Sequence, residues 1–272
     1  MAWFWIALTA PAAWAAANYI DKYMLSRYFQ DVSVGVLSIF SSIIGFPIAL
    51  VIFLIEPNVF VFSGVQLFML VAAGFITAVG FIFYFFSLEC DYTSLVVPLF
   101  QAIPVFGYLF GLLFLGEVLS PAKLLGGALI IAGAIGMTTS FTGHGWRFNR
   151  RVFWLMIASS ALLALQSLLF KMSATADVYW PAMFWQLLGY GLLAAYLLLG
   201  RPQWRRDFVG LLRKSSGPIL GLNLFNEALS AVGEFAISFA FLLAPLAVVW
   251  LINGFQPVFV FLYGIVLTLL FP

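Results

Sequence analysis

The stretch LFQAIPVFGYLFG, residues 99–111, decides the fold expected for this chain, because a similar stretch returns later in it. INGFQPVFVFLYG, residues 252–264, can be laid over it so that Pro104 falls on Pro257, an offset of 153 residues. Both stretches are apolar and carry a proline near the middle. Internal repeats of this kind are typical of membrane transporters, many of which are built from two copies of one unit.

A second pair of matching stretches supports the same repeat. NYIDKYM, residues 18–24, can be laid over SLLFKMS, residues 167–173, with Lys22 on Lys171 and an offset of 149 residues. Both matches are short, but they agree in order and in spacing. Together they predict a repeated unit of about 150 residues.

The composition places the chain in a membrane. It has 272 residues, of which 64% are hydrophobic and 8% are charged, and its mean hydropathy is +1.11. Soluble domains carry about 25% charged residues, so this chain has too few to cover a surface in water. We therefore expect an all-α integral membrane protein whose surroundings are the lipid bilayer and which has no nucleic-acid partner.

Apolar runs bounded by charged residues, proline and glycine predict nine membrane-spanning helices. Each run is close to the roughly twenty residues that cross a bilayer as a helix. The sequence predicts only connections between the runs, and residues 201–217 form the longest of them. The nine ranges are 3–22, 33–55, 66–87, 93–116, 122–141, 152–171, 181–200, 218–241 and 245–270.

The basic residues give the predicted orientation. Of the twelve Lys and Arg residues, only Lys123 and Lys171 fall on one side of the nine spans, and basic residues accumulate in cytoplasmic connections. This places the connections after spans one, five and seven in the cytoplasm, the N-terminus outside, and the chain in the cell (inner) membrane. The basic residues on the cytoplasmic side are Lys22, Arg27, Arg147, Arg150, Arg151, Arg201, Arg205, Arg206, Arg213 and Lys214.

Five spans form the first copy of the repeat, and an odd number makes the second copy enter the membrane in the opposite direction. The second copy contains four spans, and nothing equivalent to GEVLSPAKLLGGALIIAGAIGM, residues 116–137, follows Pro272. Two explanations are open: the chain is a fragment, or it dispenses with a tenth helix. We favour a fragment, because a missing helix would leave a lipid-facing gap in the packing.

The stretch SLVVPLFQAIPVFGYLFGLLFLGEVLSPAKLLGGALIIAGAIG, residues 94–136, resembles the end of an EamA domain. The matching features are the proline in the fourth helix, LGE at 115–117 and the glycine-rich fifth helix. EamA domains belong to the drug/metabolite transporter superfamily. The resemblance covers the whole chain, with one domain at 3–140 and a second, truncated domain at 152–272.

The resemblance also implies an architecture and a mechanism. It implies a helical bundle of two inverted five-helix repeats, with helices one, three, four, six, eight and nine around a central cavity. It further implies secondary transport by alternating access. In this chain the second repeat lacks its last helix, so nine spans are seen instead of ten.

One face of the eighth predicted span is polar. Asn223, Glu227, Ser230, Glu234 and Ser238 are spaced 4, 3, 4 and 4 residues apart, which is the spacing of one helix face. Lipid cannot hydrogen-bond such a stripe, so it is expected to face protein or water. Two interpretations are open, a dry contact between helices and the lining of a cavity, and we favour the cavity.

Two lysines are candidate partners for the glutamates of this stripe. Lys22 with Glu227 near the inner end and Lys171 with Glu234 near the outer end would be two pairs related by the repeat, each a latch of a gate. The alternative is that both lysines reach lipid headgroups. Either glutamate could also carry a proton (H⁺), or a cationic substrate could sit against it, and the sequence does not choose between these roles.

Further polar and aromatic side chains are candidates for the same cavity. Gln101 precedes Pro104, and Asn253 and Gln256 precede Pro257, at positions where a proline frees a backbone carbonyl one turn back. The predicted substrate-binding residues are Trp14, Asn18, Tyr84, Gln101, Gln166, Asn223, Asn226, Glu227, Glu234, Asn253 and Gln256.

Other groups do not indicate catalysis. Glu117 lies close to Ser120 and Pro121 at the start of a new helix and is predicted to cap the helix or brace a loop. His144 and Cys90 are the only residues of their types, which is too few for an ordinary metal site, and no cofactor is expected.

The first hypothesis for the function is a secondary transporter of a small organic metabolite or drug, with proton coupling as an option. An alternative is a lipid carrier or flippase, or a membrane assembly subunit, without a soluble substrate. An enzyme embedded in the membrane would need a cluster of acid, base or metal groups at one interface, and the sequence shows none, so we expect no enzymatic activity.

Overall fold

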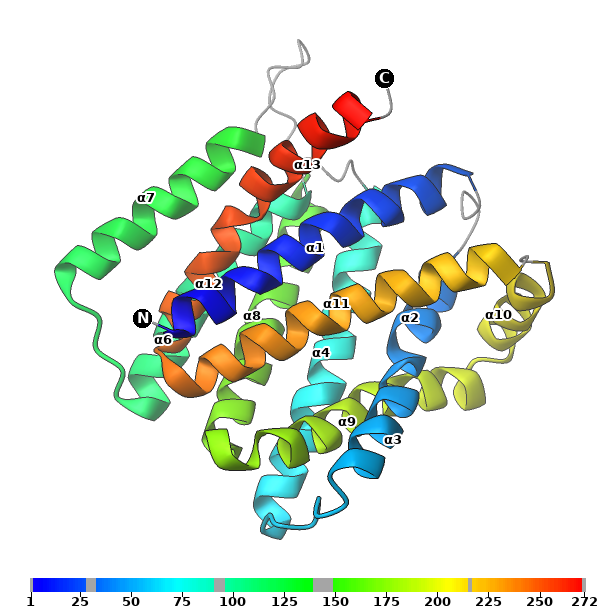
Figure 1. Ribbon diagram of the computed structural model, residues 1–272, viewed down its shortest axis with the longest axis horizontal. Coiled ribbons are helices and arrows are strands. Elements are labelled where there is room, and N and C mark those ends of the chain that lie inside the picture. The colour runs from blue at the N-terminus through cyan, green and yellow to red at the C-terminus, as the bar shows by residue number, and fades with distance from the viewer. Residues whose placement is uncertain (1, 28–32, 91–95, 139–148, 215–216, 271–272) are drawn as a thin grey trace.

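A computed structural model describes residues 2–27, 33–90, 96–138, 149–214 and 217–270, and the regular structure in these ranges is helical throughout (Figure 1). The first half contains α1 (Ala2–Arg27), α2 (Val34–Ile43), α3 (Gly45–Ile55), α4 (Gly64–Cys90), the 3-10 helix η1 (Val97–Ala102), α6 (Ile103–Leu115) and α7 (Pro121–Thr138). The second half contains α8 (Arg150–Ser173), η2 (Ala176–Val178), α9 (Tyr179–Gly200), α10 (Pro202–Lys214), α11 (Gly217–Leu243), α12 (Leu246–Ile252), η3 (Asn253–Phe255) and α13 (Gln256–Leu270).

The helices have the length and composition of a multi-pass membrane protein. Within the described residues, six segments are long and apolar enough to cross a bilayer, and Leu99–Leu115 and Pro121–Gly133 are shorter apolar helices. Large apolar side chains cover the outside of the bundle, among them Leu54, Phe68 and Leu199, which is the arrangement expected in lipid. The six segments are Val34–Ile55, Gly64–Cys90, Arg150–Ser173, Ala176–Gly200, Leu220–Leu243 and Leu246–Leu269. The count of nine spans and their inverted topology remain predictions.

The two matching proline stretches have the same local structure. In each, a 3-10 helix leads directly into an α-helix whose second residue is the proline, η1 into Pro104 and η3 into Pro257. Proline lacks a backbone N–H and is tolerated in the first turn of a helix, where that donor has no intrahelical partner. The aligned prolines therefore begin a new helix at corresponding points of the fourth and ninth predicted spans.

Helices from the two halves of the chain pack against each other. α1 packs along α11, and α4 packs along α8; Figure 1 shows α1 and α11 side by side across the bundle. In the predicted repeat these are pairs of first and third helices taken from opposite copies. An apolar core between α1, α8, α11 and α12 joins the halves, and it includes Leu168, Ile237, Phe241 and Trp250.

The connection at residues 201–217 contains a helix, α10, which the analysis of spans did not predict. Trp204 and Phe208 on α10 pack against α2 and α9, while Arg205 and Arg206 are exposed. Gly35 makes this docking possible, because a Cβ there would lie 2.0 Å from the Trp204 ring. The helix is short and amphipathic, and a search for long apolar runs does not detect such a pattern.

Candidate functional site

A large cavity lies inside the bundle. Its volume is about 2060 Å³, and its walls come from helices of both halves of the chain, including α1, α4, α8, α9, α11 and α13. Pockets for drug-sized ligands commonly measure about 300–1,000 Å³, so this cavity has room for a small solute and water around it.

The cavity occupies one end of the bundle. Its walls reach Met24, Glu89 and Leu269, close to the helix ends on the side that carries most of the basic residues. Toward the other side they stop at Gln166 on α8 and Glu234 on α11, although these helices continue to Ser173 and Leu243. The apolar core around Phe241 and Trp250 fills the bundle beyond that point. The cavity is thus closed toward the outer side of the predicted orientation.

All the residues predicted to bind substrate line this cavity. They come from seven different elements, and the polar face of α11 contributes the largest share. The lining includes Trp14, Asn18, Tyr84, Gln101, Gln166, Asn223, Asn226, Glu227, Glu234, Asn253 and Gln256. Whether they bind a solute remains a prediction.

A hydrogen-bonded cluster forms the deep end of the cavity. Gln186 Nε2 donates to Gln166 Oε1 and to Glu234 Oε1, each at 3.2 Å, and Ser238 Oγ donates to the same Glu234 oxygen at 3.3 Å. Gln186 lies on α9 and was not among the predicted residues. Its signal in the sequence is a lone amide within an otherwise apolar span, which is a costly placement unless the amide has partners.

A second cluster lies nearer the mouth. Asn226 Nδ2 donates to Asp21 Oδ1 at 2.6 Å, and Ser41 Oγ donates to Glu227 Oε1 at 3.1 Å. Asp21 was not predicted either, although it sits in the repeated stretch NYIDKYM. The side chain of Lys22 lies outside the described residues, so the proposed pair of Lys22 with Glu227 is not tested.

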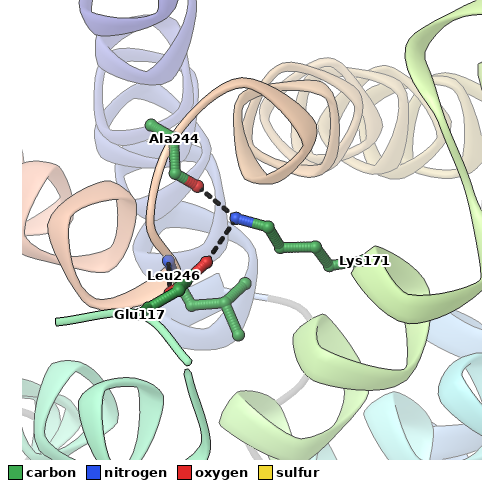
Figure 2. Close-up of polar contacts among 4 residues, drawn as sticks. All are labelled: Glu117, Lys171, Ala244 and Leu246. Atoms are coloured by element: carbon green, nitrogen blue, oxygen red, sulfur yellow. Dashed lines mark hydrogen bonds and ion pairs between the residues drawn. The ribbon is translucent and has the colours of Figure 1, made fainter. Parts of the chain in front are cut away.

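The predicted pair of Lys171 with Glu234 is wrong. Lys171 Nζ instead donates to Glu117 Oε1 and to the Ala244 carbonyl, both at 2.6 Å (Figure 2). Lys171 is in the last turn of α8, where it meets the junction of α11 and α12. Glu234 is ten residues before Ala244, about 15 Å farther along the helix. That distance places Glu234 out of reach of the lysine.

Glu117 braces this junction, as the sequence analysis predicted. Its Oε2 accepts a hydrogen bond from the backbone N–H of Leu246 at 2.9 Å, at the start of α12 (Figure 2). The chain turns into position at Gly116, whose φ of +66° favours glycine. A Cβ at Gly111 would lie 2.5 Å from Glu117 Oε2, so the glycine also leaves room for the carboxylate.

Aromatic side chains hold the cavity walls together. Trp14 Nε1 donates to the Ser230 carbonyl at 3.2 Å, which joins α1 to α11, and Tyr19 Oη donates to the Val260 carbonyl at 2.6 Å, which joins α1 to α13. The rings of Tyr84 and Phe100 lie 5.0 Å apart on another part of the wall. Most of the lining is apolar, so the polar groups are confined to the two clusters and the α11 face.

The family model of the EamA-like transporter family matches residues 1–139, about half of the chain. The chain belongs to the EamA-like transporter family. This agrees with the resemblance of residues 94–136 to an EamA domain, and the family belongs to the drug/metabolite transporter superfamily. No curated protein matches the sequence of this EamA protein.

The fold of the EamA protein also occurs among solved structures. One of them, titled "Crystal structure of protein", superposes with a TM-score of 0.72 over 100% of this chain and 90% of the other. The two sequences are 18% identical, so the match concerns the fold alone.

The electrostatic character of the EamA protein's cavity is acidic. Among the described lining residues, Asp21, Glu89, Glu227 and Glu234 are carboxylates, and none is a lysine or arginine. In an environment of low dielectric constant, these groups attract cations or protons more strongly than they would in water. The site is equipped for recognition by hydrogen bonds and charge.

Proposed function

We propose that this EamA protein is a secondary transporter that moves a small organic metabolite or drug across the cell (inner) membrane by alternating access. The observation that carries the proposal is the large cavity with polar clusters, open toward one end of a membrane-spanning bundle and closed toward the other. A solute can enter such a cavity without crossing the bilayer, and release on the other side requires the closed end to open.

The reciprocal packing of the two halves supports this mechanism. α1 packs on α11 and α4 packs on α8, so two pairs of helices from opposite halves can rock against each other as bodies. The tie of Lys171 to Glu117 and Ala244 lies at the closed end. In our proposal the tie holds the cytoplasm-open state and is released when the outer side opens.

Proton coupling is part of the proposal. Glu227 and Glu234 line the cavity and have few hydrogen-bond donors around them, so protonation removes a charge that is costly to desolvate. A proton taken up with or exchanged for the solute would change the charge of the cavity between its two states.

Uptake by purified protein in proteoliposomes tests the proposal. A panel of radiolabelled metabolites and drugs is measured with and without a pH gradient, against empty liposomes. We expect protein-dependent, saturable uptake of at least one small organic solute, and a pH gradient should stimulate it. Movement of fluorescent lipid between leaflets with no uptake of any solute would contradict the proposal and favour a lipid carrier.

A further inference from the structure

Two buried amide oxygens in the cavity have no hydrogen-bond partner among the described residues. They are Gln186 Oε1 in the deep cluster and Asn226 Oδ1 in the cluster near the mouth. The side chains are 3% and 4% exposed, and both line the cavity. A buried acceptor without a partner costs about 1–3 kcal/mol, so a donor is expected at each position when the site is in use.

The neighbouring carboxylates fix these oxygens as acceptors. Gln186 Nε2 donates to Glu234 Oε1, and Asn226 Nδ2 donates to Asp21 Oδ1. Turning either amide around would place its oxygen against a carboxylate oxygen, which an ionised carboxylate does not tolerate. The unfilled positions therefore require N–H or O–H donors from a ligand.

The charge around these positions selects among donors. Each orphan oxygen belongs to an amide that is bonded to a carboxylate, and the described lining residues include no lysine or arginine that would neutralise it. A ligand that brings both an N–H and a positive charge satisfies the amide and the carboxylate together. A neutral alcohol supplies only the donor, and a quaternary ammonium supplies only the charge.

We propose that the cavity binds an organic cation with N–H groups, a protonated primary or secondary amine. This inference rests on the proposed transport function and names the class of its substrate. Trp14, Phe81, Tyr84 and Phe100 line the same cavity and offer aromatic faces to the body of the ligand and to its charge. The ligand is thus an amphipathic amine with an aromatic or branched apolar body.

Calorimetric titration of the protein in nanodiscs tests the class with matched probes. The amines are 2-phenylethylamine and tryptamine, and each is compared with its N,N,N-trimethyl analogue and with the corresponding alcohol. We expect the amine to bind about tenfold or more tightly than either analogue, as one charge-assisted hydrogen bond predicts. Equal binding of the alcohols, or of the trimethyl analogues, would overturn the inference and leave the orphan oxygens to water.

Variants locate the preference at the deep cluster. Glu234→Gln keeps the shape of the side chain and removes its charge, and it should reduce the preference for amine over alcohol about tenfold. Glu56→Gln is the matched control, because Glu56 follows α3 and does not line the cavity. An unchanged preference in Glu234→Gln, with the fold confirmed by circular dichroism, contradicts the assignment.

The inference and the proposed function fail in different experiments. If proteoliposomes transport only neutral or anionic solutes, the amine class is wrong and the transport function stands. If the amines bind with the expected preference and no solute is transported, the site assignment stands and the transport function is wrong.

Discussion

Lys171 and Glu117 form an ion pair with 2.6 Å between Nζ and Oε1, and it joins α8 to the end of α6 where the cavity is closed. The two side chains are 19% and 13% exposed, so both charges are largely withdrawn from solvent. The lysine also binds the Ala244 carbonyl, and the glutamate binds the Leu246 N–H. Three segments that are distant in sequence thus meet at one pair of charges.

Breaking this pair should destabilise the closed end. We expect Glu117→Gln or Lys171→Met to lower the free energy of unfolding by about 2–4 kcal/mol, since each leaves a buried charge without its partner. The double variant should lose less than the sum of the single losses. Thermal unfolding in detergent measures all three, and strictly additive losses would show that the two charges do not interact.

The backbone at Gly116 predicts a cost for any side chain. Gly116→Ala places an L-residue at a φ of +66°, which should destabilise the protein by about 1–2 kcal/mol. Gly126→Ala is a suitable control, because Gly126 is within α7 and nothing lies within 4 Å of its added Cβ. The control should be neutral or slightly stabilising. Equal melting temperatures for the two variants would contradict the left-handed turn.

The docking of α10 depends on Gly35. In Gly35→Val the new side chain would occupy the place of the Trp204 ring, so α10 should separate from α2 and become accessible to protease. Gly210→Ala changes α10 itself at a position with open space around it and should leave the digestion pattern as it is. If both variants are digested at the wild-type rate, Trp204 does not pack at Gly35.

The glutamates of the cavity predict the response of transport to pH. Glu227→Gln and Glu234→Gln should each reduce or abolish the stimulation of uptake by a pH gradient, because neither amide can bind and release a proton. Uptake by exchange at equal pH measures the remaining transport in the same vesicles. The proton-coupling proposal fails if both variants keep the wild-type response to the gradient.

The sequence predicted the lining of the cavity better than it predicted the contacts within it. The spacing of Asn223, Glu227, Ser230 and Glu234 identifies a polar helix face, and that information is local to one segment. The aligned prolines likewise identified a local break in two helices. The partner of a charged side chain depends on how helices distant in sequence are placed against each other, which spacing along one helix does not encode.

The errors follow from this difference. Lys171 was assigned to Glu234 by depth in the membrane, and depth did not reveal that Glu117 is within closer reach. Gln186 was overlooked because a single amide forms no stripe, and Asp21 because it adjoins a lysine near the end of a helix. Lone polar residues inside apolar spans are therefore worth the same attention as periodic ones.

Access to Ser230 from each side of the membrane tests the central claim most directly. Ser230 lines the cavity, and Ser230→Cys in a Cys90→Ser background carries a single reactive thiol. A membrane-impermeant maleimide should label it rapidly from the side that carries α10 and slowly from the opposite side. Labelling from neither side, or faster labelling from the opposite side, would contradict a water-filled cavity that opens toward the basic end of the bundle.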